Sequence, residues 1–298
     1  MKTRRLLTSV LGFYTWACVN FHAEQGQAAL PSAGIYLRAT NQFAEACFFK
    51  PAEAATNDLA FTLAPLILQE VIGATEPPAQ PDRFGTLSLS NGLLALDRTR
   101  LAIYWQADTV RLKGKEHVRF SYAWCYSPGA SGQGEFALAL QGIRITLNGA
   151  GQPAIWEVLA DSSGAELIFV SQSLEAAAQG EFGKALPARR YAIERSVEEA
   201  PKVIVARVID DGPTAMGPFV YLSAGTRTVS TLICRCMPAQ AKKLLGTSAY
   251  DLLPFQAMAA RPFLAQAKVL VREQTAFWPG DQGSDDRLEH CLRLPTAF

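Results

Sequence analysis

Turn signals recur at short intervals along this chain and separate short apolar runs. Asn91-Gly92 is the clearest of them, because it lies between the alternating run 87–90 and the apolar run 93–96. Asn-Gly readily adopts the positive φ angles of a two-residue hairpin turn. Lys113-Gly114-Lys115 and Asn148-Gly149 also separate apolar runs. This pattern predicts an α+β fold that consists predominantly of antiparallel β-sheet with a few short helices.

The expected strands are short runs in which apolar residues alternate with polar ones or follow one another directly. The run 202–209 is rich in β-branched residues, which favour a buried strand. The expected strands cover residues 87–90, 93–96, 101–105, 109–112, 118–126, 143–147, 155–159, 167–170, 202–209, 219–222 and 228–234.

Helix signals are few in this sequence. Ser173 is a suitable cap for a short helix over 174–179, and Gly180 is suited to end it. Pro238 favours a helix over 239–245, because proline is well tolerated at a first helical position.

Prolines also divide longer segments of the chain. Pro65 splits 59–72 into a strand and then a short helix or second strand, and 250–260 is a helix candidate that contains a proline. The Pro-rich stretch 76–81 is either a domain linker or, as we favour, a surface loop, because proline cannot pair in a central strand. We therefore expect a single β-rich domain over 29–298.

The first 28 residues have the layout of a secretory signal peptide. A basic start precedes an uncharged, mostly apolar run over 6–21, and small residues surround an expected cleavage site near Ala28 or Ala29. The apolar run is short against the ~20 residues that a membrane-spanning helix needs. We expect an exported, soluble bacterial protein in the periplasm or outside the cell, with lipidation at Cys18 as an alternative.

Composition narrows the classes of partner. Hydrophobic residues make up 49% of the chain and charged residues 18%, as in an ordinary globular protein. The formal net charge is +1 and no long basic run is present, so a nucleic-acid partner is not expected. No later apolar segment is long enough to cross a membrane, so we expect no transmembrane segment in the mature chain. A protein or glycan partner stays open, and the sequence identifies no cofactor.

An acidic pair leads into a loop that contains two Gly-Pro pairs. Asp210 and Asp211 follow the expected strand 202–209, and adjacent carboxylates can bind a hard cation or share a proton. A solvated strand exit is the alternative interpretation. The glycines and prolines predict a rigid loop, and rigid loops on a β scaffold often carry binding sites. The candidate binding-loop residues are Gly212, Pro213, Met216, Gly217 and Pro218.

A Cys-Arg-Cys motif is the sharpest local feature. If the strand continues through Cys236, the sulfurs of Cys234 and Cys236 project from one face, with Cα atoms about 6.6 Å apart. That distance is near the limit for a disulfide, so we expect the two cysteines not to be bonded to each other. Cys236 also precedes the helix expected from Pro238, and a helix N-terminus lowers the pKa of a thiol.

These cysteines also suggest a metal or thiol site. Together with His290 and Cys291 they supply Cys₃His, a known zinc ligand set. The C-x-C spacing differs from the usual C-x₂-C of zinc sites. Five cysteines follow the signal region, so at least one of them is left outside any intramolecular disulfide.

Familiar catalytic motifs, such as G-x-S-x-G, H-E-x-x-H and the Walker phosphate loop, are absent from the sequence. Beyond the signal region only His117 and His290 could serve a nucleophile as base, and we interpret His117 as an exposed turn residue. A glycan hydrolase needs carboxylates and aromatic platforms but no histidine, and Glu157, Asp210 and Asp211 are its candidate carboxylates.

The sequence thus leaves the function unknown, and three hypotheses remain. We favour a non-catalytic binding or envelope-associated protein. The alternatives are a carboxylate-dependent hydrolase that acts on glycans and a thiol or zinc-site protein centred on the Cys234/Cys236 pair.

Overall fold

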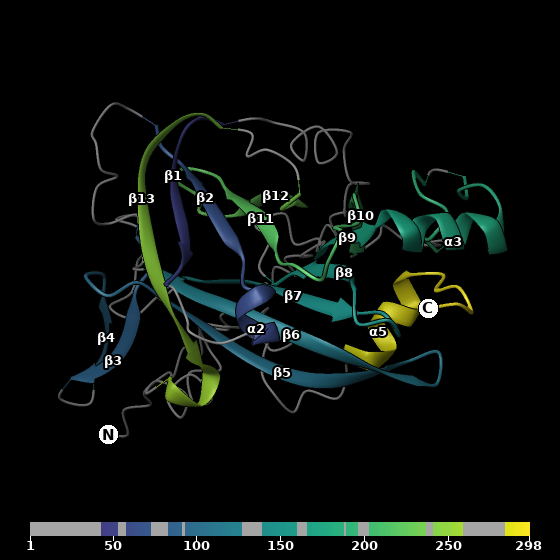
Figure 1. Ribbon diagram of the computed structural model, residues 1–298, viewed down its shortest axis with the longest axis horizontal. Helices are drawn as coiled ribbons and strands as arrows, with labels where there is room; N and C mark the ends of the chain where they lie inside the picture. Colours follow the sequence, from purple (N-terminus) through teal and green to yellow (C-terminus); the bar gives the residue numbers. More distant parts are fainter. Residues whose placement is uncertain are drawn as a thin grey trace, which may run out of the picture.

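The computed structural model describes residues 43–52, 58–72, 83–90, 93–126, 139–159, 166–187, 189–195, 203–236, 241–258 and 284–298. The expected signal peptide over 1–28 and the Pro-rich stretch 76–81 lie outside the described residues. Strands dominate the described part of the chain, and eleven of them form one sheet that curls until it is nearly closed (Figure 1). In sheet order they are β10 (Val203–Ile209), β9 (Glu166–Ser171), β8 (Pro153–Val158), β7 (Ala139–Leu147), β6 (Lys115–Tyr126), β5 (Ala102–Leu112), β13 (Ala241–Pro254), β1 (Phe43–Pro51), β2 (Leu66–Glu70), β11 (Pro218–Leu222) and β12 (Val229–Cys234).

The sheet is mixed, so the expectation of a predominantly antiparallel sheet is only partly right. Neighbouring strands from β5 to β9 pair in antiparallel fashion, as do β1 with β2 and β11 with β12. Four pairs are parallel, namely β9 with β10, β5 with β13, β1 with β13 and β2 with β11. Strands β1 and β2, which precede residues 76–81, therefore share one sheet with strands that follow them. A single domain stays a prediction.

One hydrophobic core fills the inside of the curled sheet. Each of the eleven strands contributes at least one buried side chain to it. On β6, for example, Phe120, Tyr122, Trp124 and Tyr126 alternate with residues that do not join this core. Alternate residues of a strand face opposite sides of a sheet, so this core marks the inner face.

The segment around α2 (Leu59–Thr62) enters this interior. Its backbone carbonyls accept hydrogen bonds from inward-facing side chains. Tyr122 Oη lies 2.7 Å from the Ala60 carbonyl and Tyr250 Oη lies 2.6 Å from the Pro65 carbonyl, while Arg235 Nη2 donates to Ala64 O. Burial raises the pKa of both tyrosine hydroxyls, which keeps them protonated as donors. The interior therefore satisfies backbone groups that would otherwise be buried without partners.

Two helices cover part of the outer face. Helix α3 (Gln172–Phe182) and helix α5 (Ser284–Cys291) pack with outward-facing residues of β5, β8 and β9 in a second hydrophobic cluster (Figure 1). None of the helices in the described ranges is long and apolar enough to span a membrane.

The hairpins that the turn signals predict are present. Strands β3 (Thr86–Ser90) and β4 (Leu93–Asp97) pair in antiparallel fashion on either side of positions 91 and 92, which are not among the described residues. Between β5 and β6, Lys113 and Gly114 both adopt positive φ, at 52° and 76°. Between β7 and β8, the Asn148 carboxamide oxygen accepts hydrogen bonds from the Ala150 and Gln152 amides. Local turn chemistry therefore located these turns correctly.

The helices expected over 239–245 and 250–260 are not found in the described residues. Residues 241–245 begin strand β13, which continues to Pro254 before the short 3₁₀ helix η2 (Phe255–Ala257). Pro238 itself lies outside the described residues. Within 59–72 the helix α2 lies where a strand was expected, whereas the strand β2 after Pro65 agrees with the second-strand alternative.

Helix α3 is present but longer than predicted. Ser171, rather than Ser173, caps it by accepting a hydrogen bond from the Leu174 amide. Gly180 lies inside the helix, which ends at Gly183 with a φ of 77°.

His117 is buried, contrary to its interpretation as an exposed turn residue. Its Nδ1 lies 3.0 Å from the Leu147 carbonyl oxygen, and its ring stacks on Phe298 with centroids 4.4 Å apart. The turn itself is exposed, but β6 carries His117 beneath the C-terminal residues.

Candidate functional site

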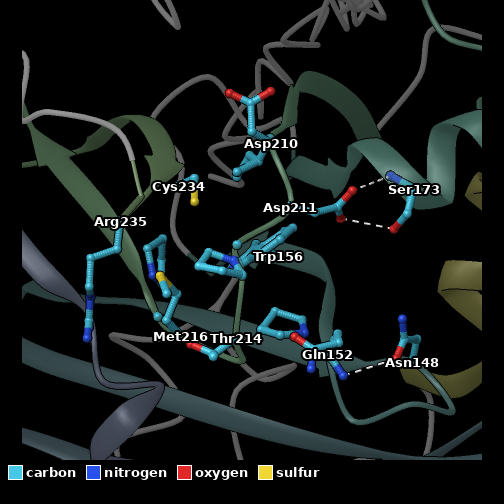
Figure 2. Close-up of a pocket in the computed structure, with 16 residues that line it drawn as sticks. Asn148, Gln152, Trp156, Ser173, Asp210, Asp211, Thr214, Met216, Cys234 and Arg235 are labelled. Atoms are coloured by element: carbon cyan, nitrogen blue, oxygen red, sulfur yellow. Dashed lines mark hydrogen bonds between the residues drawn. The ribbon is translucent and has the colours of Figure 1, made fainter.

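A pocket of about 410 Å³ opens at one end of the curled sheet (Figure 2). Ile209, the last residue of β10, and Cys234, the last residue of β12, both line it. Strands β10 and β12 are the two edge strands of the sheet. The pocket therefore lies where the sheet fails to close completely.

The remaining pocket walls come from ends of other elements. The turn between β7 and β8, the first turn of α3, the loop from β10 to β11 and the residue after β12 each contribute to the lining. These residues are Asn148, Gln152, Pro153, Trp156, Ser173, Asp210, Asp211, Gly212, Pro213, Thr214, Met216, Gly217, Pro218 and Arg235.

The floor of the pocket is apolar and its rim is polar. Trp156, Ile209 and Cys234 belong to the interior core, and all three are buried. Figure 2 shows Met216 between Arg235 and Trp156. Gln152 and Thr214, on the rim, are exposed. A pocket with this distribution can take a small molecule that has one apolar and one polar part.

All five candidate binding-loop residues line this pocket. Gly217 brings its loop against the turn after α2, where its amide donates to the Thr62 carbonyl at 3.1 Å. A Cβ at Gly217 would lie 2.6 Å from the Ala64 carbonyl oxygen, closer than real Cβ contacts come. The loop is therefore fixed by close backbone packing that only glycine permits.

The two loop carboxylates differ in their surroundings. Both oxygens of Asp211 accept hydrogen bonds from Ser173 at the start of α3. Asp210 is exposed, and in Figure 2 its carboxylate points away from Trp156 and Thr214. Asp211 therefore holds the loop in place, whereas Asp210 stands at the outer rim.

Glu157 is not part of this pocket. It lies next to Arg144 across the β7–β8 pair, and the two side chains form an ion pair at 3.0 Å. Their side chains are only 1% and 3% exposed. Because Trp156 faces the interior, its neighbour Glu157 faces the outer side of the sheet. The structure therefore does not bring Glu157 together with Asp210 or Asp211.

The expectation that Cys234 and Cys236 are not bonded to each other is wrong. A disulfide joins them, with Cα atoms 5.2 Å apart. Strand β12 ends at Cys234, and Arg235 and Cys236 form a turn, which shortens the distance expected for a continuous strand. The helix expected after Cys236 is also absent from the described residues, where β13 begins at Ala241.

His290 and Cys291 lie in helix α5, on the outer face of the sheet. Cys234 faces the interior and is bonded to Cys236. Within the described ranges, no group of three or more His, Cys, Asp or Glu residues could hold a metal ion. The Cys₃His set is thus not assembled in this part of the chain.

Sequence reasoning did not identify Asn148, Gln152, Ser173 or Arg235 as site residues. Asn148 and Gln152 belong to a recognisable hairpin turn, but only the curling of the sheet brings that turn near the β10–β11 loop.

A comparison of the chain with protein-family models, with curated proteins and with solved structures finds no match.

Proposed function

We propose that this protein is an exported, non-catalytic binding protein that takes a small, partly apolar molecule into the pocket at the mouth of its curled sheet. The observation that carries this proposal is the combination of an apolar floor, formed by Trp156, Ile209 and Cys234, with a polar rim. Ligand sites are typically concave, mostly apolar and furnished with a few polar groups, and they often lie at such mouths.

The size of the pocket supports a small ligand. Pockets for small molecules range from about 300 to 1,000 Å³, and this one has about 410 Å³. The loop that forms one wall is anchored at both ends, through Asp211 to α3 and through Gly217 to the turn after α2. A preformed wall favours binding, because little conformational freedom is lost when the ligand enters.

The arrangement of carboxylates favours binding over glycan hydrolysis. Glycosidases generally place two carboxylates about 5–10 Å apart on either side of the scissile bond. Here the oxygens of Asp211 are engaged by Ser173, and Glu157 faces the other side of the sheet. Of these three candidate carboxylates, Asp210 alone lines the pocket without such a contact to Ser173.

A blocking variant tests the proposal. Thr214 is an exposed rim residue, so Thr214→Trp should fill the pocket entrance without disturbing the core. Thr109→Trp is the matched control, because Thr109 is exposed on β5 outside the pocket lining. Anilinonaphthalene sulfonate, which has apolar rings and one charged group, serves as the fluorescent probe.

We expect saturable probe binding in the wild type and in Thr109→Trp, and at least about tenfold weaker binding in Thr214→Trp. Equal affinity in all three proteins would contradict the assignment of the pocket. Turnover of a glycan panel by the wild type that disappears in a folded Asp210→Asn variant would replace the proposal with hydrolysis.

A further inference from the structure

The two cysteines of the Cys234–Cys236 disulfide differ in their exposure to solvent. Cys234 is buried, with 7% of its surface exposed, and lines the pocket. Cys236 is exposed in the turn that follows β12. A thiol–disulfide exchange reaction begins when a thiolate attacks one sulfur of the disulfide, so access decides which sulfur is attacked. At this bridge the more exposed residue is Cys236, which favours attack at its sulfur.

The surroundings of Cys234 favour its departure as a thiolate when the disulfide is attacked. The backbone N–H of Cys236 lies 3.1 Å from Cys234 Sγ and donates to it. A hydrogen bond to the charged form of a group stabilises that form. If the bridge opens, the same N–H can stabilise a Cys234 thiolate, and a stabilised thiolate leaves faster.

The disulfide also fixes the position of the residue between the two cysteines. Arg235 extends from this short ring into the interior of the sheet, where it donates to the Ala64 carbonyl oxygen. Figure 2 shows its side chain running away from Asp210 along one side of the pocket. The turn that the bridge closes therefore holds one wall of the pocket in place.

We propose that the Cys234–Cys236 bridge is a reversible thiol–disulfide exchange site on the pocket wall, and that a dithiol is its reaction partner. A thiolate of the dithiol bonds to Cys236 Sγ, the bond between the two cysteines breaks, and its electron pair leaves with Cys234 as a thiolate. The second thiol of the dithiol then loses its proton and attacks the dithiol sulfur that is bonded to Cys236. The mixed disulfide breaks, and Cys236 is released as a thiolate.

The reaction balances as a two-electron exchange. The two cysteines take up two protons and end as thiols, while the dithiol ends as a disulfide. The reverse reaction restores the bridge from a partner disulfide. This activity concerns the bridge itself and does not depend on which molecule occupies the pocket.

The first experiment uses the wild-type protein and reduced dithiothreitol under native conditions. After a short incubation, free thiols are blocked with iodoacetamide and located by peptide mass spectrometry, while circular dichroism reports whether the protein stays folded. We expect modification of Cys234 and Cys236 in the folded protein. Cys125 is the internal control and should stay unmodified in the folded protein, because burial raises the pKa of its thiol to about 12.

The second experiment compares the reaction of two single variants with glutathione disulfide. In Cys234→Ser the exposed Cys236 should form a mixed disulfide roughly tenfold or more faster than the buried Cys234 does in Cys236→Ser. Equal rates would overturn the assignment of Cys236 as the attacked sulfur. A wild-type bridge that resists dithiothreitol until the protein unfolds would overturn the proposal even if neither variant folds.

Discussion

Asp211 caps helix α3 from a different segment of the chain. Its carboxylate accepts one hydrogen bond from the backbone N–H of Ser173 and one from the Ser173 hydroxyl, both at 2.9 Å. Ser171, the N-cap residue, satisfies the next amide, that of Leu174. A carboxylate near a helix N-terminus is also favoured by the helix dipole. One side chain therefore joins the pocket loop to the start of the helix.

Asp211→Ala should lower the free energy of unfolding by about 1 kcal/mol, the typical cost of losing a helix cap. Asp210→Ala is the matched control, because Asp210 is the adjacent aspartate of the same loop and is exposed at the outer rim of the pocket. Urea denaturation of both variants measures the difference. Equal stability of the two variants would show that the Ser173 contacts contribute nothing to the fold.

Gly217→Ala should destabilise the protein by about 1–3 kcal/mol, as is usual when a group is forced into a packed site. The added methyl group would meet the carbonyls of Leu63 and Ala64, which are backbone atoms and cannot rotate away. Gly149→Ala is the control, because a Cβ there meets nothing within 4 Å. Chemical denaturation should leave this control within about 0.5 kcal/mol of the wild type.

Local sequence signals predicted the hairpins but not the order of the sheet. The Lys113-Gly114 and Asn148-Gly149 turns join strands that are neighbours in the sequence, so turn chemistry alone could locate them. Three of the four parallel pairs, β1 with β13, β5 with β13 and β2 with β11, join strands from distant parts of the chain. No turn specifies those pairs, so only the packing of the whole molecule determines them.

Strand β13 shows why the predicted helix failed. Its first half is rich in alanine, lysine and leucine, which are good helix formers, and Leu244 is 49% exposed. It therefore lacks the alternation of a half-buried strand. The hydrogen bonds that β13 makes with both β1 and β5 outweigh this local helix preference. Strand β13 lies between these two strands and joins the two halves of the sheet.

The pocket was partly visible in the sequence. The Gly-Pro pairs indicated a rigid loop, and the contacts of Gly217 give the physical reason for that rigidity. The sequence did not reveal that Trp156 would lie opposite this loop, because a strand tryptophan can face either side of a sheet. The disulfide was also missed, since nothing local showed that β12 ends at Cys234.

Gly180→Ala should stabilise the protein by about 0.5–1 kcal/mol, because alanine loses less backbone freedom than glycine inside a helix. Gly180 is exposed within α3, and a Cβ there meets nothing within 4 Å. Gly183→Ala is expected to have the opposite effect and to cost about 1 kcal/mol or more, because Gly183 has a φ of 77°. Thermal unfolding of the two variants should show shifts of opposite sign.

We propose that the chain is exported and cleaved near Ala28 or Ala29, as expected from its basic start and apolar run. Intact-mass analysis of protein from the native envelope fraction should find a species that lacks the first 27 or 28 residues. A full-length cytosolic species would contradict export. A lipid on Cys18 would instead indicate an anchored protein.

Glu194 should make the stability of the protein depend on pH. The residue is 2% exposed, and its carboxylate accepts hydrogen bonds from the Arg190 and Tyr191 amides at 2.9 and 2.8 Å. Burial raises the pKa of Glu194 above its ordinary value of 4.5, and these hydrogen bonds, together with Arg189, offset only part of that rise.

Between pH 4.5 and the higher pKa of the folded state, the folded protein therefore binds more protons at Glu194 than the unfolded chain does. The contribution of Glu194 to the free energy of unfolding should fall as the pH rises through this window and then level off. Glu194→Gln keeps an acceptor oxygen but does not titrate, so it serves as the reference. Urea denaturation at stepped pH should show the wild type losing stability relative to Glu194→Gln as the pH rises. A difference that grows in favour of the wild type would instead mean that the ionised carboxylate is the form that the fold stabilises.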